Sequence, residues 1–374
     1  MNEYITAKKT RLHVAVIALV FSATLWPLQS SAQNCWLERV PPAPSLPPFS
    51  FDVNSMAYDL NRQVVVLFEF DVNAGATRTL EWDGVHWREK AFGTGPSRRE
   101  GFQMVYFPTK GVTTLFGGYN AGEDFRETWE WNGFSWTLVS NTGPSARHGH
   151  TMAFDPQRGV LVLFGGGGDG LQEDTWEWNG SVWSLKSSTG PSPRYFSAMA
   201  HDAARGEMIL FGGATGGTVF DDTWKWNGTS WTQLAAPGPS PRAGHAMVYY
   251  NGEIFMFGGD GAVGFGAPNN ETWVWNGGAW SQLATSGPSR RYHHGMAVDV
   301  NRERVVLFGG KTTACSYCYL DDTWEWDGNL WMQPSITPGH QTFFPGLAFD
   351  SDRGVTVLFG GSAPGPGVYF SSRT

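Results

Sequence analysis

One nine-residue motif, Thr-Trp-Glu-Trp-Asn-Gly-Phe-Ser-Trp at residues 128–136, sets the organisation of the whole sequence. Close copies of it recur at intervals of 47 to 51 residues along the chain. A regular period of this length indicates a repeat architecture, in which each repeat is one supersecondary unit that buries its apolar face against the next. The copies, the first of them weaker than the others, begin at Thr79, Thr128, Thr175, Thr223, Thr272 and Thr323.

The motif itself predicts a β-hairpin. An Asn-Gly pair between two apolar runs favours a two-residue type I′ turn, here at residues 132–133. In that register Trp131 pairs with Phe134, and Trp129 pairs with Trp136. Because side chains alternate between the two faces of a strand, these aromatic residues share one face. Such a face requires a neighbouring sheet to cover it.

The first half of each repeat predicts a second hairpin. In one copy two apolar runs, within residues 147–155 and 160–166, flank an Asp-x-x-Arg-Gly turn, and the second run ends in Phe-Gly-Gly. Two hairpins per repeat give four strands, which is one blade of a β-propeller. There are seven such first halves against six second halves. Their final aromatic residues are Phe68, Phe116, Phe164, Phe211, Phe257, Phe308 and Phe359.

These features resemble the Kelch repeat over nearly all of residues 35–374. The resemblance lies in the Gly-Gly that closes the second strand, the spaced aromatic residues of the third and fourth strands, and Arg147 and His150 before the first strand. It implies an all-β, seven-bladed β-propeller of four-stranded blades at residues 33–374. The tight Asn-Gly turn is shorter than the one usual in the family.

Kelch-type propellers include the central domain of galactose oxidase, whose copper site needs two Tyr, two His and a Cys bonded to one of the Tyr. None of the three cysteines of this chain lies in a matching motif. The oxidase activity is therefore not expected here, and we predict neither a cofactor nor a metal site.

The tryptophans predict how the ring closes. Of 19 Trp, 17 lie in the six hairpin motifs and Trp26 lies near the N-terminus, which leaves Trp36. Cys35-Trp36-Leu37 is therefore expected to be a fourth strand that the N-terminus gives to the last blade. That blade is predicted to be incomplete, because the sequence ends at Thr374, where a seventh Thr-Trp motif would begin.

Residues 1–32 predict a signal peptide. Lys8, Lys9 and Arg11 precede the apolar residues 14–28, and small residues follow at 30–32. The protein is then expected to be secreted or periplasmic; an uncleaved membrane anchor is the alternative. No other stretch is apolar and long enough to span a bilayer.

The charge of the chain disfavours nucleic acid as a partner. Residues 1–32 hold three basic residues and Glu3, so their removal changes the formal net charge from −8 to −10. Binding to phosphate backbones requires a strongly basic surface. We expect a monomer that binds a protein or a glycan.

The cysteines predict one structural disulfide. Two residues separate Cys315 from Cys318, so a disulfide between them would close a short loop in an oxidising compartment. Zinc needs about four ligands, and no second Cys or His pair lies nearby in the sequence. Cys35 is then left over.

Arginine and histidine recur before the first strand of the repeats and could ring the mouth of a central channel. They would form a pocket for an anion or an acidic sugar; alternatively, residues repeated in every blade stabilise the blade by bonding loop carbonyls. Asp174, Asp222 and Asp322, which precede the Thr-Trp motif, are expected to be turn residues rather than calcium ligands. The candidate ligand-binding residues are Arg99, Arg147, His148, His150, Arg194, Arg242, His245, Arg291, His293 and His294.

The sequence therefore predicts a non-catalytic binding scaffold for a protein or a glycan. Variable loops between the second and third strands, such as residues 261–270 and 311–320, would carry the binding. The alternative is a carbohydrate-active enzyme with its site at the channel mouth, which would need paired acids or a general base there.

Overall fold

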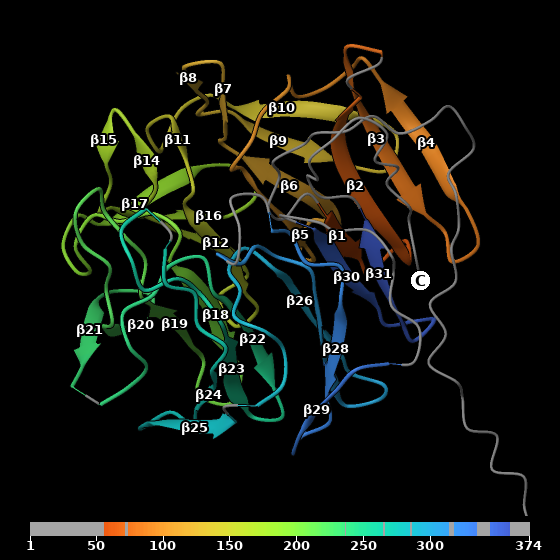
Figure 1. The fold of residues 1–374 in the computed structure, drawn as a ribbon. Helices are drawn as coiled ribbons and strands as arrows, with labels where there is room; N and C mark the ends of the chain where they lie inside the picture. The colour runs from red at the N-terminus through yellow and green to blue at the C-terminus, as the bar shows by residue number, and fades with distance from the viewer. Residues whose placement is uncertain are drawn as a thin grey trace, which may run out of the picture. The chain divides into compact units, whose positions relative to one another are not determined.

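The computed structural model describes residues 56–71, 74–235, 237–264, 266–284, 286–313, 318–334 and 345–359. The chain divides into the units 1–33 and 34–374, and the described residues all belong to the second. Their regular structure consists of strands (Figure 1). Within these ranges no helix is long and apolar enough to cross a membrane.

Three four-stranded antiparallel sheets, here blades 1 to 3, form the first half of this unit. Blade 1 contains β1 (Met56–Asp59), β2 (Val64–Asp71), β3 (Ala76–Trp82) and β4 (Trp87–Phe92). Blade 2 contains β5 (Gln103–Phe107), β6 (Val112–Phe116), β9 (Thr128–Trp131) and β10 (Trp136–Ser140). Blade 3 contains β12 (Thr151–Asp155), β13 (Val160–Phe164), β16 (Thr175–Trp178) and β17 (Trp183–Ser187).

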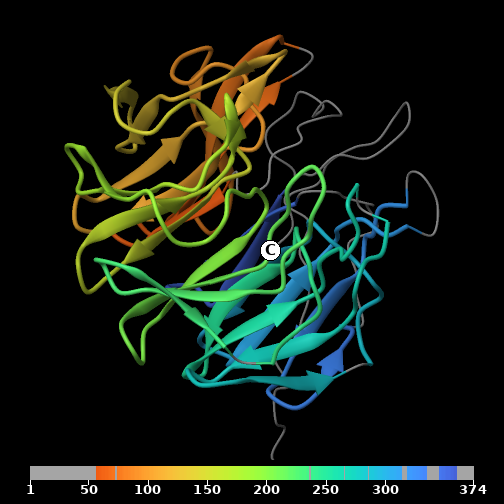
Figure 2. The ribbon, with the colours of Figure 1, turned by 90° about the vertical axis from the view of Figure 1, so that its left-hand side faces the viewer.

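Blades 4 to 6 repeat the same order of strands. Blade 4 contains β18 (Ala198–Asp202), β19 (Glu207–Phe211), β20 (Thr223–Trp226) and β21 (Trp231–Leu234). Blade 5 contains β22 (Ala246–Tyr250), β23 (Glu253–Phe257), β24 (Thr272–Trp275) and β25 (Trp280–Ala284). Blade 6 contains β26 (Gly295–Asp299), β27 (Arg304–Phe308), β28 (Thr323–Trp326) and β29 (Trp331–Met332). Figure 2 shows the sheets of blades 4 to 6 in green to blue.

The remaining strands are short or belong to an incomplete sheet. The loops of blades 2 and 3 add β7 (Tyr119–Asn120), β8 (Glu123–Asp124), β11 (Arg147–His148), β14 (Gly167–Gly168) and β15 (Gly170–Leu171). A two-stranded sheet, β30 (Gly346–Asp350) with β31 (Val355–Phe359), ends the described part. Strand β30 lies beside β26 of blade 6 and β1 of blade 1, so the innermost strands follow one another in a closed circuit.

The all-β architecture of four-stranded blades is confirmed, but the predicted number of seven blades is wrong. The described residues form six four-stranded blades, and the position between blades 6 and 1 is held by the two-stranded sheet β30–β31. The physical reason is in the sequence, because no Thr-Trp-x-Trp motif follows Phe359. The fourth strand predicted at Cys35–Leu37 and a third strand near residues 368–374 lie outside the described residues.

The Asp-x-x-Arg-Gly turn forms the predicted first hairpin. Asp155 is buried, and its carboxylate accepts hydrogen bonds from the amides of Gln157 and Arg158, both at 3.0 Å. The guanidinium of Arg158 binds the same carboxylate at 2.8 Å. Gly159 then takes a positive φ of 64°, which favours glycine. The turn therefore sets the register in which Asp155 pairs with Val160.

The hairpin of the Thr-Trp motif has a different register from the predicted one. Trp131 pairs with Trp136, not with Phe134, so the loop contains four residues. A type I′ turn needs positive φ at both central residues, and only Gly133 has it. The Asn132 side chain instead accepts the amides of Phe134 and Ser135, at 2.9 and 3.0 Å. Phe134 therefore points to solvent and is 84% exposed.

The paired tryptophans form the contact between successive blades. Trp131 and Trp136 are buried with ring centroids 5.6 Å apart. The indole N–H of the fourth-strand tryptophan crosses to the previous blade and donates to the threonine that begins the motif there. Five such bonds of 2.7 to 2.8 Å join Trp136 to Thr79, Trp183 to Thr128, Trp231 to Thr175, Trp280 to Thr223, and Trp331 to Thr272.

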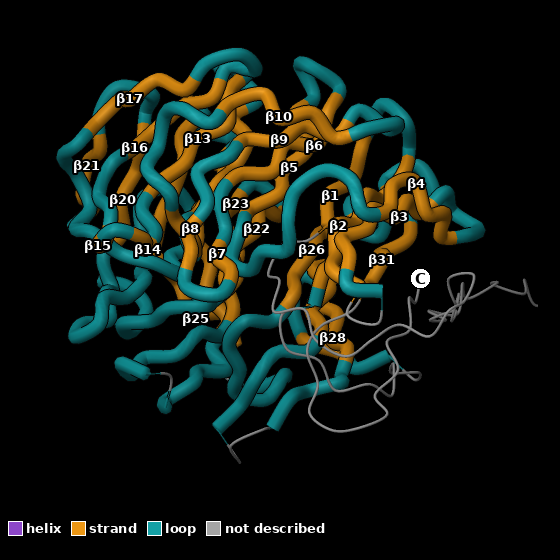
Figure 3. The backbone as a smooth tube through the Cα atoms, turned by 90° about the horizontal axis from the view of Figure 1, so that it is seen from above, coloured by secondary structure: helices purple, strands orange, loops and turns teal. Residues whose placement is uncertain are grey.

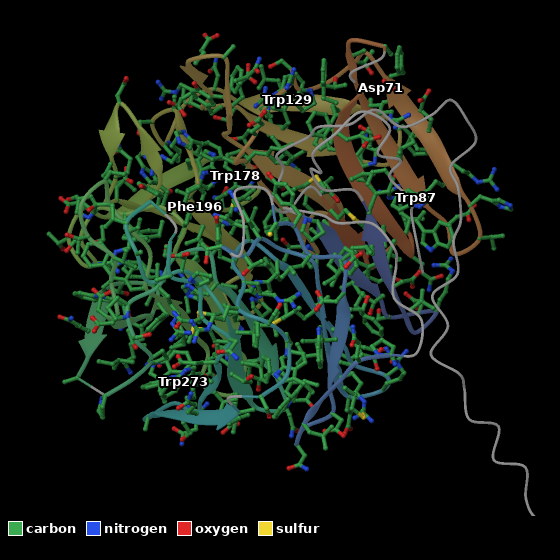
Figure 4. All side chains as sticks on the ribbon, viewed as in Figure 1. Asp71, Trp87, Trp129, Trp178, Phe196 and Trp273 are labelled. Carbon is green, nitrogen blue, oxygen red and sulfur yellow. The ribbon has the colours of Figure 1, made fainter. Side chains whose placement is uncertain are left out.

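We predict that Trp178→Ala lowers the free energy of unfolding by about 3–5 kcal/mol, because the indole is fully buried between blades and its removal leaves a cavity. Figure 4 labels this residue within the blades. Val182→Ala in the same hairpin is the control; that side chain is 54% exposed, and its loss should cost less than about 0.5 kcal/mol. Denaturant unfolding measures both, and equal costs would contradict the burial of the aromatic face.

Candidate functional site

The innermost strands of blades 2 to 6 and β30 surround a cavity of about 280 Å³. Its wall is formed by the first residues of each strand and by the residues just before them, so one end of the cavity lies where these strands begin. Figure 3 shows the strands in orange and the connecting loops in teal. Among the described residues that line the cavity there is no Asp, Glu, Lys or Arg.

A belt of backbone hydrogen bonds joins the blades at this end of the cavity. Its members, three residues before the methionine of each inner strand, are Gly101, Gly149, Phe196, Gly244 and His293. From Gly149 onward, each amide donates to the carbonyl of the previous member, which makes four bonds of 2.8 to 3.0 Å. All five have positive φ, from 50° to 66°. We call these five residues the belt.

The five predicted arginines lie in the interior of the blades instead of on the cavity wall. Arg147 is fully buried and donates to both carboxylate oxygens of Asp174, at 2.6 and 3.0 Å, and to the Gly165 carbonyl at 3.0 Å. Arg194 and Arg291 bind both carboxylate oxygens of Asp222 and Asp322 in the same way. Arg99 and Arg242 each bind one oxygen of a glutamate, Glu127 and Glu271.

This arrangement bears on the predicted roles of the arginines and of the aspartates that precede the Thr-Trp motif. Burial alone would raise the pKa of Asp174, but the hydrogen bonds and charge of Arg147 outweigh it and lower the pKa. Asp174, Asp222 and Asp322 are therefore the acidic partners of the arginines, a role that was not predicted for them from the sequence. The arginines donate to a backbone carbonyl at the Phe-Gly-Gly end of the second strand, as the alternative interpretation predicted, so they do not supply the positive surface of an anion pocket.

Three predicted histidines line the cavity but pack against the previous blade. His150, His245 and His294 meet the rings of Phe116, Phe211 and Phe257, with centroids 5.4 to 5.6 Å apart. Phe102 packs on Phe68 in the same way in blade 2. Neither ring nitrogen of these histidines has a hydrogen-bond partner among the described residues. They therefore fill an aromatic position of the repeat.

Burial keeps these histidines neutral. It lowers the pKa of His245 to about 3, with smaller contributions from the charges of Arg242 and His293, and it lowers the pKa of His150 and His294 well below the usual value. A neutral imidazole suits packing between aromatic rings, since a charged one would lose its hydration.

The two other predicted histidines lie nearer the loops. His148 belongs to β11, and its Nδ1 lies 2.6 Å from Asp124 in the loop of blade 2. Its ring also contacts Tyr119, with centroids 5.3 Å apart. His293 is a member of the belt and lines the cavity.

The sequence profile of the KLHDC2/KLHL20/DRC7 Kelch-repeats domain matches residues 132–276 and 174–361, which together exceed half of the chain. The chain belongs to the Kelch-repeat family. The predicted resemblance is therefore confirmed. A solved structure titled "Structure of YjhT" has the same fold, with a TM-score of 0.58, 15% sequence identity, and coverage of 77% of this chain and 99% of that one. No curated protein sequence matches the chain.

The described residues of this Kelch propeller contain no group of three or more His, Cys, Asp or Glu side chains that could hold a metal ion. Cys318 is disulfide-bonded. Its predicted partner Cys315, like Cys35, lies outside the described residues, so the pairing stays a prediction.

The sequence analysis did not single out Phe196, although it lies in the belt of the Kelch propeller and lines the cavity. A signal was available. The belt position is glycine in Gly101, Gly149 and Gly244, and it changes to a bulky residue only in Phe196 and His293 among the five described copies. A departure from a repeated glycine marks a position that the repeat alone does not explain.

We predict that the free energy of unfolding of the Kelch propeller falls as the pH drops below about 6.5. In the unfolded chain a histidine has a pKa of about 6.5 and binds a proton below that pH, whereas folded His245 stays unprotonated down to about pH 3. Stability should be full above pH 6.5 and fall by up to about 1.4 kcal/mol per pH unit for each such histidine. His245→Phe, which copies Phe102, should reduce the slope by one such contribution. Urea unfolding at pH 7.5 and 5 measures it; identical slopes would show that His245 is protonated in the fold.

Proposed function

We propose that this Kelch propeller is an exported, non-catalytic scaffold that binds a protein or a glycan at the belt end of its cavity. The observation that carries the proposal is the presence of Phe196 and His293 at belt positions. Both have a left-handed backbone, with φ of 55° and 50°, where the other described copies use glycine. Bulky residues held in this conformation cluster at ligand-binding sites.

The surroundings of the belt support binding. The residue before each belt member pairs with the loop between the second and third strands of its blade, as Tyr195 does with Ala214 and Tyr292 with Lys311. These loops differ in length and composition from blade to blade. Variable loops on a rigid scaffold are the usual carriers of recognition.

The same cavity offers little to the enzyme alternative. Glycoside hydrolysis generally uses two carboxyl groups on either side of the scissile bond. The described residues of the cavity wall include neither Asp nor Glu. Its histidines are packed on phenylalanine rings, and their lowered pKa values make them weak bases at neutral pH. Binding without chemistry is therefore the function we propose.

The binding proposal is tested by screening residues 33–374 on a glycan array and, in parallel, against candidate proteins by surface plasmon resonance. Ser197 is a half-buried residue of the cavity wall, so the larger side chain of Ser197→Trp should occupy the cavity and abolish binding of the ligand found. The control is Leu330, whose side chain is 46% exposed on the outer hairpin of blade 6; Leu330→Trp should leave ligand binding unchanged. A ligand that ignores Ser197→Trp would place the site elsewhere.

We also propose that residues 35–37 form the fourth strand of the incomplete blade that contains β30 and β31, and cover its outer edge. Two buried groups beside this edge lack the partner that their equivalents have in the other blades. Thr323 Oγ1 receives no indole N–H, and Trp87 Nε1 reaches no threonine, among the described residues. A strand that carries Trp36 next to blade 6 would supply the donor that Thr323 lacks.

Deletion of residues 33–40 tests this closure. It should lower the melting temperature much more than the loss of a free tail, because it would expose the outer edge of the last blade and remove the indole that Thr323 is proposed to bind. Trp36→Phe, which keeps the ring and removes the N–H, should cost about 1 kcal/mol, and Thr323→Val should cost no more when Trp36→Phe is already present. Unchanged melting after the deletion would exclude the closure.

A further inference from the structure

The fold gives every described belt position a left-handed backbone, but it does not require the bulky side chains of Phe196 and His293 there. The belt hydrogen bonds are made equally by Gly101, Gly149 and Gly244, so a glycine satisfies the backbone at this position. A bulky residue at positive φ costs on the order of 1 kcal/mol or more. Two such residues at one end of one cavity therefore need a reason that lies in their side chains.

The left-handed backbone brings the two rings together over the mouth of the cavity. The Phe196 ring lies 3.1 Å from the place where a Cβ on Gly149 would be, and the His293 ring lies 2.8 Å from the corresponding place on Gly244. The rings thus lie on the two neighbouring glycines. They meet edge to face, with centroids 4.9 Å apart and an interplanar angle of 75°.

Two tyrosines extend the pair. Tyr195 meets Phe196 edge to face at 4.9 Å, and Tyr292 meets His293 at 5.2 Å. Burial, with smaller effects of Asp260 and Tyr319, raises the pKa of Tyr292 to about 12, so its phenol stays protonated. Blades 4 and 6 thus place four aromatic rings together beside the belt; Tyr292 and His293 are buried, and Tyr195 and Phe196 are half-buried.

The chemistry of the wall selects the class of ligand. Burial, with a smaller contribution from Lys311, lowers the pKa of His293 to about 3, so this ring is neutral at the mouth. The described wall holds no ionic side chain, but it does hold the hydroxyls of Thr151 and Ser197 and the carboxamide of Gln103. Aromatic faces beside uncharged hydrogen-bonding groups match a sugar ring, which has C–H bonds on its faces and hydroxyls at its edge.

We propose that Phe196 and His293 are the specificity-determining residues of a site for a neutral sugar at the belt end of the cavity, with Phe196 stacked on the pyranose face. This inference rests on the proposed binding function and narrows it. It also replaces the anion pocket that was one of the two interpretations of the arginines, because these arginines are paired with acids inside the blades.

The experiment uses residues 33–374. Binding is first screened on an array of neutral oligosaccharides (β-glucans, β-mannans and xylans) and uronic-acid oligosaccharides. Candidate proteins are screened in parallel by surface plasmon resonance. The best neutral binder is then titrated by calorimetry into wild type, Phe196→Gly, Phe196→Leu and His293→Gly. Glycine restores the residue of the other belt positions, so these variants should fold and melt within a few degrees of wild type. We expect Phe196→Gly and Phe196→Leu each to weaken binding at least tenfold, and His293→Gly to weaken it severalfold.

A matched control is Phe134→Gly, which removes an exposed aromatic ring from the loop between β9 and β10, a loop that does not line the cavity, and should leave binding unchanged. The affinity should also be constant between pH 5 and 8 and at high salt, because neither the sugar nor the described cavity wall carries a charge. Equal affinity of wild type and Phe196→Gly would overturn the role of the pair. Binding of uronic acids or of a protein, without neutral sugars, would overturn the sugar class and keep the scaffold function. Binding of nothing in any screen would overturn both.

Discussion

The hydrogen bond from a fourth-strand tryptophan to a threonine of the previous blade is the interaction on which the arrangement of the blades depends. Strand pairing holds each four-stranded blade together, but it does not connect the main sheet of one blade to that of the next. The indole connects the two sheets in two ways: its ring fills the apolar space between them, and its N–H hydrogen bond fixes their relative position. A buried indole N–H that lost its acceptor would cost about 1–3 kcal/mol, so the repeated threonine adds to the stability that the tryptophan ring provides.

This pairing explains why much of the fold could be predicted from the sequence. The Thr-Trp and Phe-Gly-Gly motifs mark the same strands in every copy, and the period alone indicates blades. The hairpin register could not be predicted as well. Asn132-Gly133 is compatible with a two-residue turn or with a four-residue loop capped by the asparagine side chain. Only the packing of Trp131 against Trp136 between two blades favours the second, and that contact is not visible in one hairpin.

The candidate site was harder to predict because repetition and function give opposite signals. Arg147 and its equivalents attracted attention as charges repeated at one position, yet each of them neutralises an acid of its own blade. Asp174 could not be recognised as that partner, because 27 residues separate it from Arg147 in the chain. Phe196 was missed for the converse reason: it interrupts a pattern of glycines whose meaning, a positive φ in a belt of backbone hydrogen bonds, becomes visible only in the folded ring.

The distribution of charge gives an independent reason to favour a neutral ligand. The five buried arginines have an acid each, so they contribute no net charge to the field outside the protein, and the formal charge of −8 belongs to the rest of the chain. An acidic ligand would therefore approach a protein of its own sign and enter a cavity whose described wall holds no cation. A neutral sugar meets neither cost. Its affinity would come from ring contacts and uncharged hydrogen bonds, which are the groups that the belt end of this cavity presents.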